Sequence, residues 1–324
     1  MIIRLFKESN PLSYLISLVG LVVIWGLWVE GVVVTEPEGN GLLYDLLIGI
    51  LSVLPQWMTS ATILLFIGTQ AYHWNLIITN HEVIYKKSLL PMLFVVVFAA
   101  MQSAFLTLNP VLPVISITIF ILDKLFSVYK NTNPLGIIFD CGFLSGVACL
   151  FWFPALTLLP FVFFSLFILK PLSLRDILVL IIGITTPLFL SFVYLLMMDT
   201  SPLMSLLLPF QNLDFYVDRG DLLQQKNWAF LILFVFTLLL AAWRINRNFY
   251  KNATRVRMYQ QTIFVLLFCT MIGFVISTDH GNHPFYYMAL PFSSMISYYF
   301  LAGKNAWWED FLFLAILVTV IMNL

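Results

Sequence analysis

The chain has few charged residues, few cysteines and none of the common soluble-enzyme motifs. Of its 324 residues, 10% are charged and 61% are hydrophobic, and the formal net charge is zero. That balance gives no reason to expect a nucleic-acid partner. The three cysteines lie inside long apolar runs, which indicates packing and not a disulfide set. No Walker loop, CxxC or HExxH motif is present, so the sequence offers no nucleotide, redox or zinc-protease site.

Long apolar runs dominate the rest of the chain. Runs of roughly 17 to 23 residues recur from end to end, and about 20 apolar residues cross a bilayer as a helix. Backbone groups in hydrocarbon must be satisfied internally, which favours helices here. We therefore predict an all-α, polytopic transmembrane bundle in one domain, residues 1–324. Its eleven expected spans are 11–33, 57–79, 89–108, 111–129, 135–152, 153–169, 175–197, 228–246, 258–277, 285–302 and 307–323. Around residues 152–154 the connection is so short that a re-entrant hairpin is an alternative.

The basic residues alternate between the loops and predict an orientation. Cytoplasmic loops of membrane proteins carry the excess of Lys and Arg. With a cytoplasmic N-terminus, only Arg219 and Lys226 of the 16 basic residues fall on the outer side. The inner loop from Arg244 to Arg257 is the most basic, and it suits either anionic lipid headgroups or simple topological anchoring.

Two outer loops hold the residues most suited to chemistry. In the first, residues 34–56, Glu36 and Glu38 flank a proline, and Asp45 lies within the apolar segment 42–54, which we expect to be an interfacial helix. An extension of the next span, kinked at Pro55, is the alternative. A carboxylate there can act as a general base or hold a divalent cation, or simply keep the loop solvated.

The second outer loop, residues 199–227, is apolar at its start and is expected to be partly embedded. Its two cations, Arg219 and Lys226, suit recognition of a phosphate. Pairing with the neighbouring Asp218 and Asp221 explains them equally well.

Three further polar residues are candidates at other places. His280 and His283 follow the ninth expected span and suit contact with a substrate or an ordinary polar turn, and their loose spacing argues against a metal site. Asp140 lies inside the fifth span, where an ionisable side chain is costly. We expect it to form a structural pair with Lys124 or Lys130, with an ion or proton path as the alternative.

Short motifs resemble an uncharacterised family of inner-membrane proteins of Bacteroidota. The resemblance covers most of the chain and implies a multi-pass protein of the bacterial inner membrane, with no stated activity. It rests on residues 6–11, Asn75, Leu76, Asn80, Lys87, Ser88, Leu90, Pro91, Asn133, Pro134, Phe139, Asp140, Gly142, Gly146, residues 153–155, Lys170, Pro171, Arg175, Gly183 and Pro187.

The layout also resembles the GT-C class of integral-membrane glycosyltransferases. The resemblance rests on the two outer loops, on Asp140 to Lys170 and on Phe285 to Pro291. It implies a polyprenyl-phosphate sugar as donor, Glu36 or Glu38 as catalytic base, Arg219 and Lys226 on the donor phosphate, and His280 or His283 on the sugar. The first loop departs from the class because it is short and has Glu36-Pro37-Glu38 in place of an adjacent acidic pair.

These features predict a protein that handles a polyprenyl-phosphate-linked sugar or glycan on the periplasmic face, as an enzyme or as a degenerate relative. The predicted partners are membrane lipids, this lipid-linked sugar and other envelope proteins. No cofactor is required, although a divalent cation suits the acidic loop. The alternatives are a non-catalytic subunit of an envelope complex and, third, a transporter of lipids or small molecules.

Overall fold

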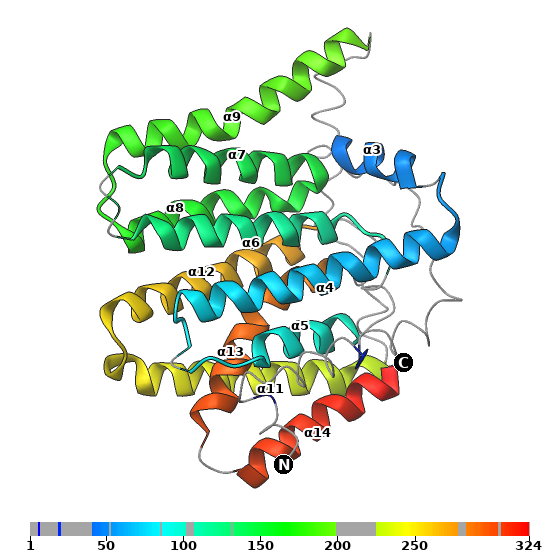
Figure 1. Ribbon diagram of the computed structural model, residues 1–324, viewed down its shortest axis with the longest axis vertical. Coiled ribbons are helices and arrows are strands. Elements are labelled where there is room, and N and C mark those ends of the chain that lie inside the picture. The colour runs from blue at the N-terminus through cyan, green and yellow to red at the C-terminus, as the bar shows by residue number, and fades with distance from the viewer. Residues whose placement is uncertain are drawn as a thin grey trace.

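The fold is described from a computed structural model (Figure 1). The structure describes residues 6, 19–20, 41–51, 53–84, 86–101, 107–129, 131, 133–198, 225–277, 283–303 and 306–323. Within these residues it contains eleven α-helices and no strand, so the chain is all-helical there, as predicted. The helices are α3 (Leu42–Leu51), α4 (Gln56–Asn80), α5 (Leu90–Ala99), α6 (Val111–Val128), α7 (Leu135–Phe151), α8 (Leu158–Leu169), α9 (Leu174–Met197), α11 (Gln225–Asn248), α12 (Thr254–Ile276), α13 (Ala289–Ala302) and α14 (Ala306–Asn323).

Five of the helices are long and apolar enough to cross a membrane. Their spanning segments are Trp57–Asn80, Val111–Val128, Leu174–Met197, Ile232–Lys251 and Thr254–Ile276. A helix rises about 1.5 Å per residue, so 18 or more residues match a hydrocarbon core about 30 Å thick. These helices identify the chain as a membrane protein.

Two apolar runs that the sequence assigns to full spans are short, buried helices. The expected span 89–108 contains α5, which ends at Ala99, and the expected span 285–302 divides into the 3₁₀ turn η5 (His283–Met288) and α13. Every residue of α5 is buried, and α13 is buried from Ala289 to Leu301. The two helices pack against each other, with α4 against α5 and α11 against α13. An apolar helix can face either lipid or other helices, and the burial of α5 and α13 shows that other helices surround them.

The segment around residue 152 forms a turn between two helices. Trp152 is extended and ends α7, and the 3₁₀ turn η3 (Phe153–Thr157) then leads into α8. Pro154 stands in the first turn of η3, where its missing N–H costs no hydrogen bond. The run 135–169 therefore consists of two helices that pack on each other.

The closest helix pair, α7 and α9, meets through glycines. A Cβ added to Gly142 would lie 2.6 Å from the Leu180 carbonyl oxygen, and one added to Gly183 would lie 2.5 Å from that of Phe139. At Gly146 the added Cβ would lie 2.5 Å from Pro187. Small residues allow such close helix approach in membranes. Gly142 and Gly146, which are four residues apart on α7, are thus both used for a contact within this chain.

The connections between helices divide between two ends of the bundle. Figure 1 shows the turns α4–α5, α6–α7, α8–α9 and α11–α12 at one end and α3 at the other. We call the first the basic end, because Lys86, Lys87, Lys170, Lys251 and Arg255 lie in or beside its turns. We call the second the α3 end. The ends of α4, α6 and α12 that form the pocket described below all lie at the basic end.

Candidate functional site

Most residues that the sequence nominates for chemistry have no described side chain. Lys226 lies within the bounds of α11 and His283 begins η5, but the side chains of both are outside the described residues. Glu36, Glu38, Arg219 and His280 lie wholly outside the described residues. Their expected grouping therefore stays a prediction, and Asp45 and Asp140 are the two that the structure places.

Asp45 is exposed on a short helix that is held firmly in place. Its neighbour Tyr44 is fully buried and donates a hydrogen bond from its hydroxyl to the Leu108 carbonyl at 2.9 Å. Gly41, just before α3, lies against the backbone of Leu150 at the end of α7. Partial burial raises the pKa of the Asp45 carboxyl above its ordinary value. Asp45 is thus an accessible carboxylate with a fixed position at the α3 end.

Asp140 lies at the basic end and is paired. The ammonium of Lys124 on α6 donates to its carboxylate at 2.7 Å, and both side chains are partly exposed. Lys124 is one of the two partners that the sequence suggests. The bond joins α6 to α7, so Asp140 has a structural partner.

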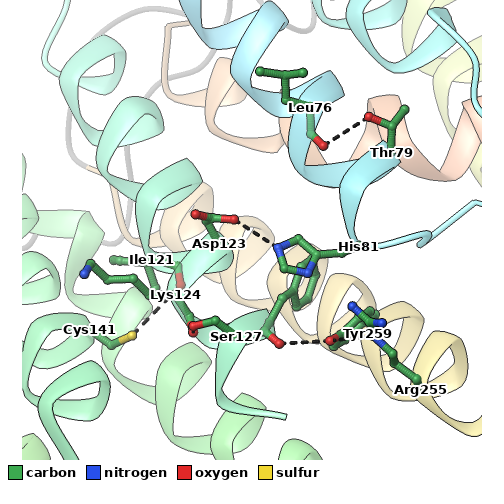
Figure 2. A network of polar contacts seen from close by, with 11 residues as sticks. Leu76, Thr79, His81, Ile121, Asp123, Lys124, Ser127, Cys141, Arg255 and Tyr259 are labelled. Carbon is green, nitrogen blue, oxygen red and sulfur yellow. Dashed lines mark hydrogen bonds and ion pairs between the residues drawn. The ribbon is translucent and has the colours of Figure 1, made fainter. Parts of the chain in front are cut away.

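A polar network that the sequence did not nominate forms where the C-terminal ends of α4 and α6 meet the N-terminal end of α12 (Figure 2). His81 caps α4, and its Nε2 lies 3.0 Å from the Asp123 carboxylate on α6. The next residue, Glu82, has a φ of 54°, a left-handed conformation that is uncommon outside glycine. That sharp turn ends α4 and leaves the His81 ring edge-on to the rings of Phe126 and Tyr259. The Nδ1 atom of His81 is buried and has no hydrogen-bond partner in the described part of the chain.

Tyr259 and Arg255 complete the network from α12. The Tyr259 hydroxyl donates to the Phe126 carbonyl at 2.9 Å and accepts from Nε of Arg255 at 3.1 Å. The Arg255 guanidinium also lies over the Tyr259 ring, 5.4 Å from its centroid. The Phe126 carbonyl belongs to the last turn of α6, which has no helical partner for its carbonyls, so the tyrosine satisfies it. One tyrosine therefore joins α12 to α6 and orients the arginine.

These side chains border a cavity of about 300 Å³ at the basic end. Its lining residues are His81, Phe126, Ser127, Tyr129, Arg255 and Tyr259. The sequence carried one signal of this pocket, which is the spacing of Arg255 and Tyr259 by four residues on one helix face. Nothing in the local sequence indicates that His81 and Asp123 meet them.

Metal binding has no support among the residues described. There, no three His, Cys, Asp or Glu side chains gather closely enough to hold an ion. The acidic pair expected to suit a divalent cation, Glu36 and Glu38, lies outside that part of the chain.

The fold and the pocket define the class as an all-helical membrane protein with a polar cavity at the basic end. The chain belongs to a family of unknown function, DUF6427, whose model matches residues 43–323. That range takes in nearly all of α3 and every later helix, so the family shares the whole described bundle. No curated protein and no solved structure matches the chain.

Proposed function

We propose that this protein handles a polyprenyl-phosphate-linked sugar or glycan at the outer face of a bacterial inner membrane. The observation that carries the proposal is the anchoring of α3 through Tyr44 at the end of the bundle opposite the basic turns. α9 ends, and α11 begins, on the α3 side in Figure 1. The described flanks of the two proposed outer loops therefore lie toward the same end of the bundle.

In this proposal the loop residues have distinct roles. Glu36 or Glu38 takes the proton of an acceptor hydroxyl as the hydroxyl attacks the anomeric carbon, and the lipid phosphate leaves. Arg219 and Lys226 hold that phosphate, because a guanidinium and an ammonium both donate to phosphate oxygens. Asp45 and the two histidines, His280 and His283, contact the sugar or a divalent cation.

The first test is the lipid that the protein retains. The full chain is purified with native lipid, and extracted lipids are compared with the bulk membrane by mass spectrometry. We expect enrichment of phosphorylated polyprenols, and its loss in the double variant Arg219→Gln, Lys226→Gln. Lys251→Gln, which removes one charge at the basic end, is the control and should retain the lipid. No enrichment in the unaltered protein would overturn the proposal.

The second test separates binding from transfer. Glu36→Gln and Glu38→Gln keep the loop's shape but remove the base. One of these two variants is expected to remove the catalytic base. That variant should retain the lipid while the amount of glycan product in membranes falls at least a hundredfold, which is a common effect of losing a general base. Unchanged product in both variants would leave a binding role without catalysis.

A non-catalytic subunit of an envelope complex is the second candidate, and α9 is the observation that favours it. This helix exposes large apolar side chains along most of its length, such as Leu178, Ile182 and Phe189. Such a surface suits a partner helix as well as lipid. Crosslinking from cysteines placed at these three positions tests it, since discrete protein adducts support a subunit and lipid-only labelling argues against one.

A further inference from the structure

We propose that the cavity between the ends of α4, α6 and α12 binds a phosphate group, and that the bound molecule is a phosphate-bearing lipid headgroup or a soluble phosphate ester. The site lies at the basic end, away from α3. The inference therefore does not rest on the proposed function, and either could fail alone.

The first support is the chemistry of the lining. The six residues around the cavity comprise an arginine, a histidine, a serine, two tyrosines and a phenylalanine, with no carboxylate among them. Asp123 is the nearest carboxylate in the network, and it is engaged by His81. The Ser127 and Tyr259 hydroxyls already donate to backbone carbonyls. A phosphate entering the cavity therefore meets Arg255 as its main donor, and no carboxylate lines the wall.

The second support is the state of Arg255. Its Nε donates to Tyr259, whereas its two Nη groups donate to none of the described residues. The tyrosine ring beneath it and the bond to its Nε hold the guanidinium in one orientation. An arginine held in this way loses less side-chain freedom when it binds, and its planar fork matches two phosphate oxygens.

The third support is the position of the His81 ring at the wall of the cavity. Asp123 accepts from Nε2 on one side of the ring, and Nδ1 on the other side has no described partner. The bond to Asp123 holds the imidazole ring in place as a polar part of the cavity wall, whereas the buried Nδ1 has almost no surface that a ligand could contact.

The size and place of the cavity agree with this ligand. A volume of about 300 Å³ is at the lower end of the range for small-molecule sites and accommodates a phosphate with part of its ester. The pocket opens beside the most basic connection of the chain, between α11 and α12. Anionic headgroups concentrate near such basic segments.

Binding is measured with the full chain in maltoside micelles, which contain no phosphate, by calorimetric titration with short-chain phosphatidate and, separately, with inorganic phosphate and glycerol phosphate. We expect saturable binding of at least one of these probes. Phosphatidate alone indicates a lipid headgroup, whereas the soluble probes binding as tightly indicate a soluble phosphate ester. No saturable binding of any probe overturns the proposal.

Two variants and one control locate the binding. Arg255→Gln is expected to weaken it about tenfold or more, the effect of losing hydrogen bonds to a charged group. Arg247→Gln is the control, since Arg247 is an exposed arginine of α11 that does not line the cavity. Equal loss in both would show general charge attraction and overturn the site. Ser127→Trp fills the exposed rim of the cavity without altering its cations, and retained binding in that variant would also overturn the proposal.

Discussion

The indole Nε1 of Trp74 donates to the hydroxyl of Ser293 at 2.9 Å, although the two residues are 219 positions apart in the sequence. Neither residue is exposed. The bond joins α4, a helix long enough to span, to α13, a short helix inside the protein. A hydrogen bond in an apolar interior is directional. It therefore fixes the position of α13 against α4, whereas apolar contacts alone would let the two helices slide past each other.

Ser293→Ala should lower the free energy of unfolding by about 1–3 kcal/mol, because it leaves the buried indole N–H without an acceptor. Ser294→Ala is the control, since the Ser294 hydroxyl donates only to the Pro291 carbonyl of its own helix. Thermal unfolding in detergent measures both. Equal effects of the two variants would show that the bond to Trp74 contributes little.

Gly142→Ala should destabilise the protein by about 1–3 kcal/mol, the usual cost of overpacking. The new methyl group would meet the Leu180 backbone at 2.6 Å, so α7 and α9 must separate. Gly136→Ala, on the same helix, meets nothing within 4 Å and should be neutral or stabilising. The two unfolding midpoints are compared, and a tolerated Gly142→Ala would contradict the close α7–α9 contact.

Two lysine–carboxylate pairs among the described residues, Lys124–Asp140 and Lys170–Asp176, should differ in strength. Lys124→Met should cost about 0–1 kcal/mol, since both partners of that bond are partly exposed. Lys170→Met should cost about 2–4 kcal/mol, because the side chain of Asp176 is only 5% exposed and loses its cation. Asp176 keeps its bonds from the Ser173 N–H and hydroxyl, which limits the loss. Unfolding of both variants under the same conditions gives the order, and a larger cost for Lys124→Met would reverse the interpretation.

The bond between Lys124 and Asp140 also predicts how Asp140 variants behave. If the carboxylate belonged to an ion or proton path, Asp140→Asn would abolish transport while leaving stability nearly unchanged. The bond to Lys124 predicts instead a small loss of stability in Asp140→Asn that disappears when Lys124→Met is already present. A double-mutant cycle measures that coupling, and additive effects would contradict it.

Tyr44→Phe should loosen α3 without unfolding the bundle. The variant removes the hydroxyl that donates to Leu108 and should cost about 1 kcal/mol locally. Hydrogen exchange of residues 42–51 should rise by about fivefold while exchange of α7 stays the same. Tyr72→Phe, at an exposed position of α4, is the control. Unchanged exchange in α3 would show that the hydroxyl does not anchor it.

Composition was sufficient to predict the class of fold, but it did not show which helices are buried by other helices and which are exposed. The expected spans 89–108 and 175–197 look alike as apolar segments, yet α5 is enclosed by other helices and α9 is largely exposed. Apolar side chains suit both lipid and a protein interior, so hydropathy alone does not separate them. The contacts of α5 with α4 and α13 make that distinction.

The polar pocket could not be predicted from the sequence for a different reason. His81, Asp123 and Tyr259 come from three helices that are far apart in the chain, and none stands in a motif. They lie close together because the C-terminal ends of α4 and α6 and the N-terminal end of α12 lie at the same end of the bundle. By contrast, Lys124 and Asp140 are 16 residues apart across one turn, which is why their pairing could be anticipated.

The sequence by itself determined that this is an all-helical membrane protein with basic turns, because long apolar runs must satisfy their backbone locally and cations avoid hydrocarbon. Only the tertiary structure decided which apolar helices are buried, how glycines let α7 and α9 meet, and which polar side chains gather at the basic end. Those outcomes depend on side-chain packing and hydrogen bonds between distant segments, and local composition carries no record of such partners.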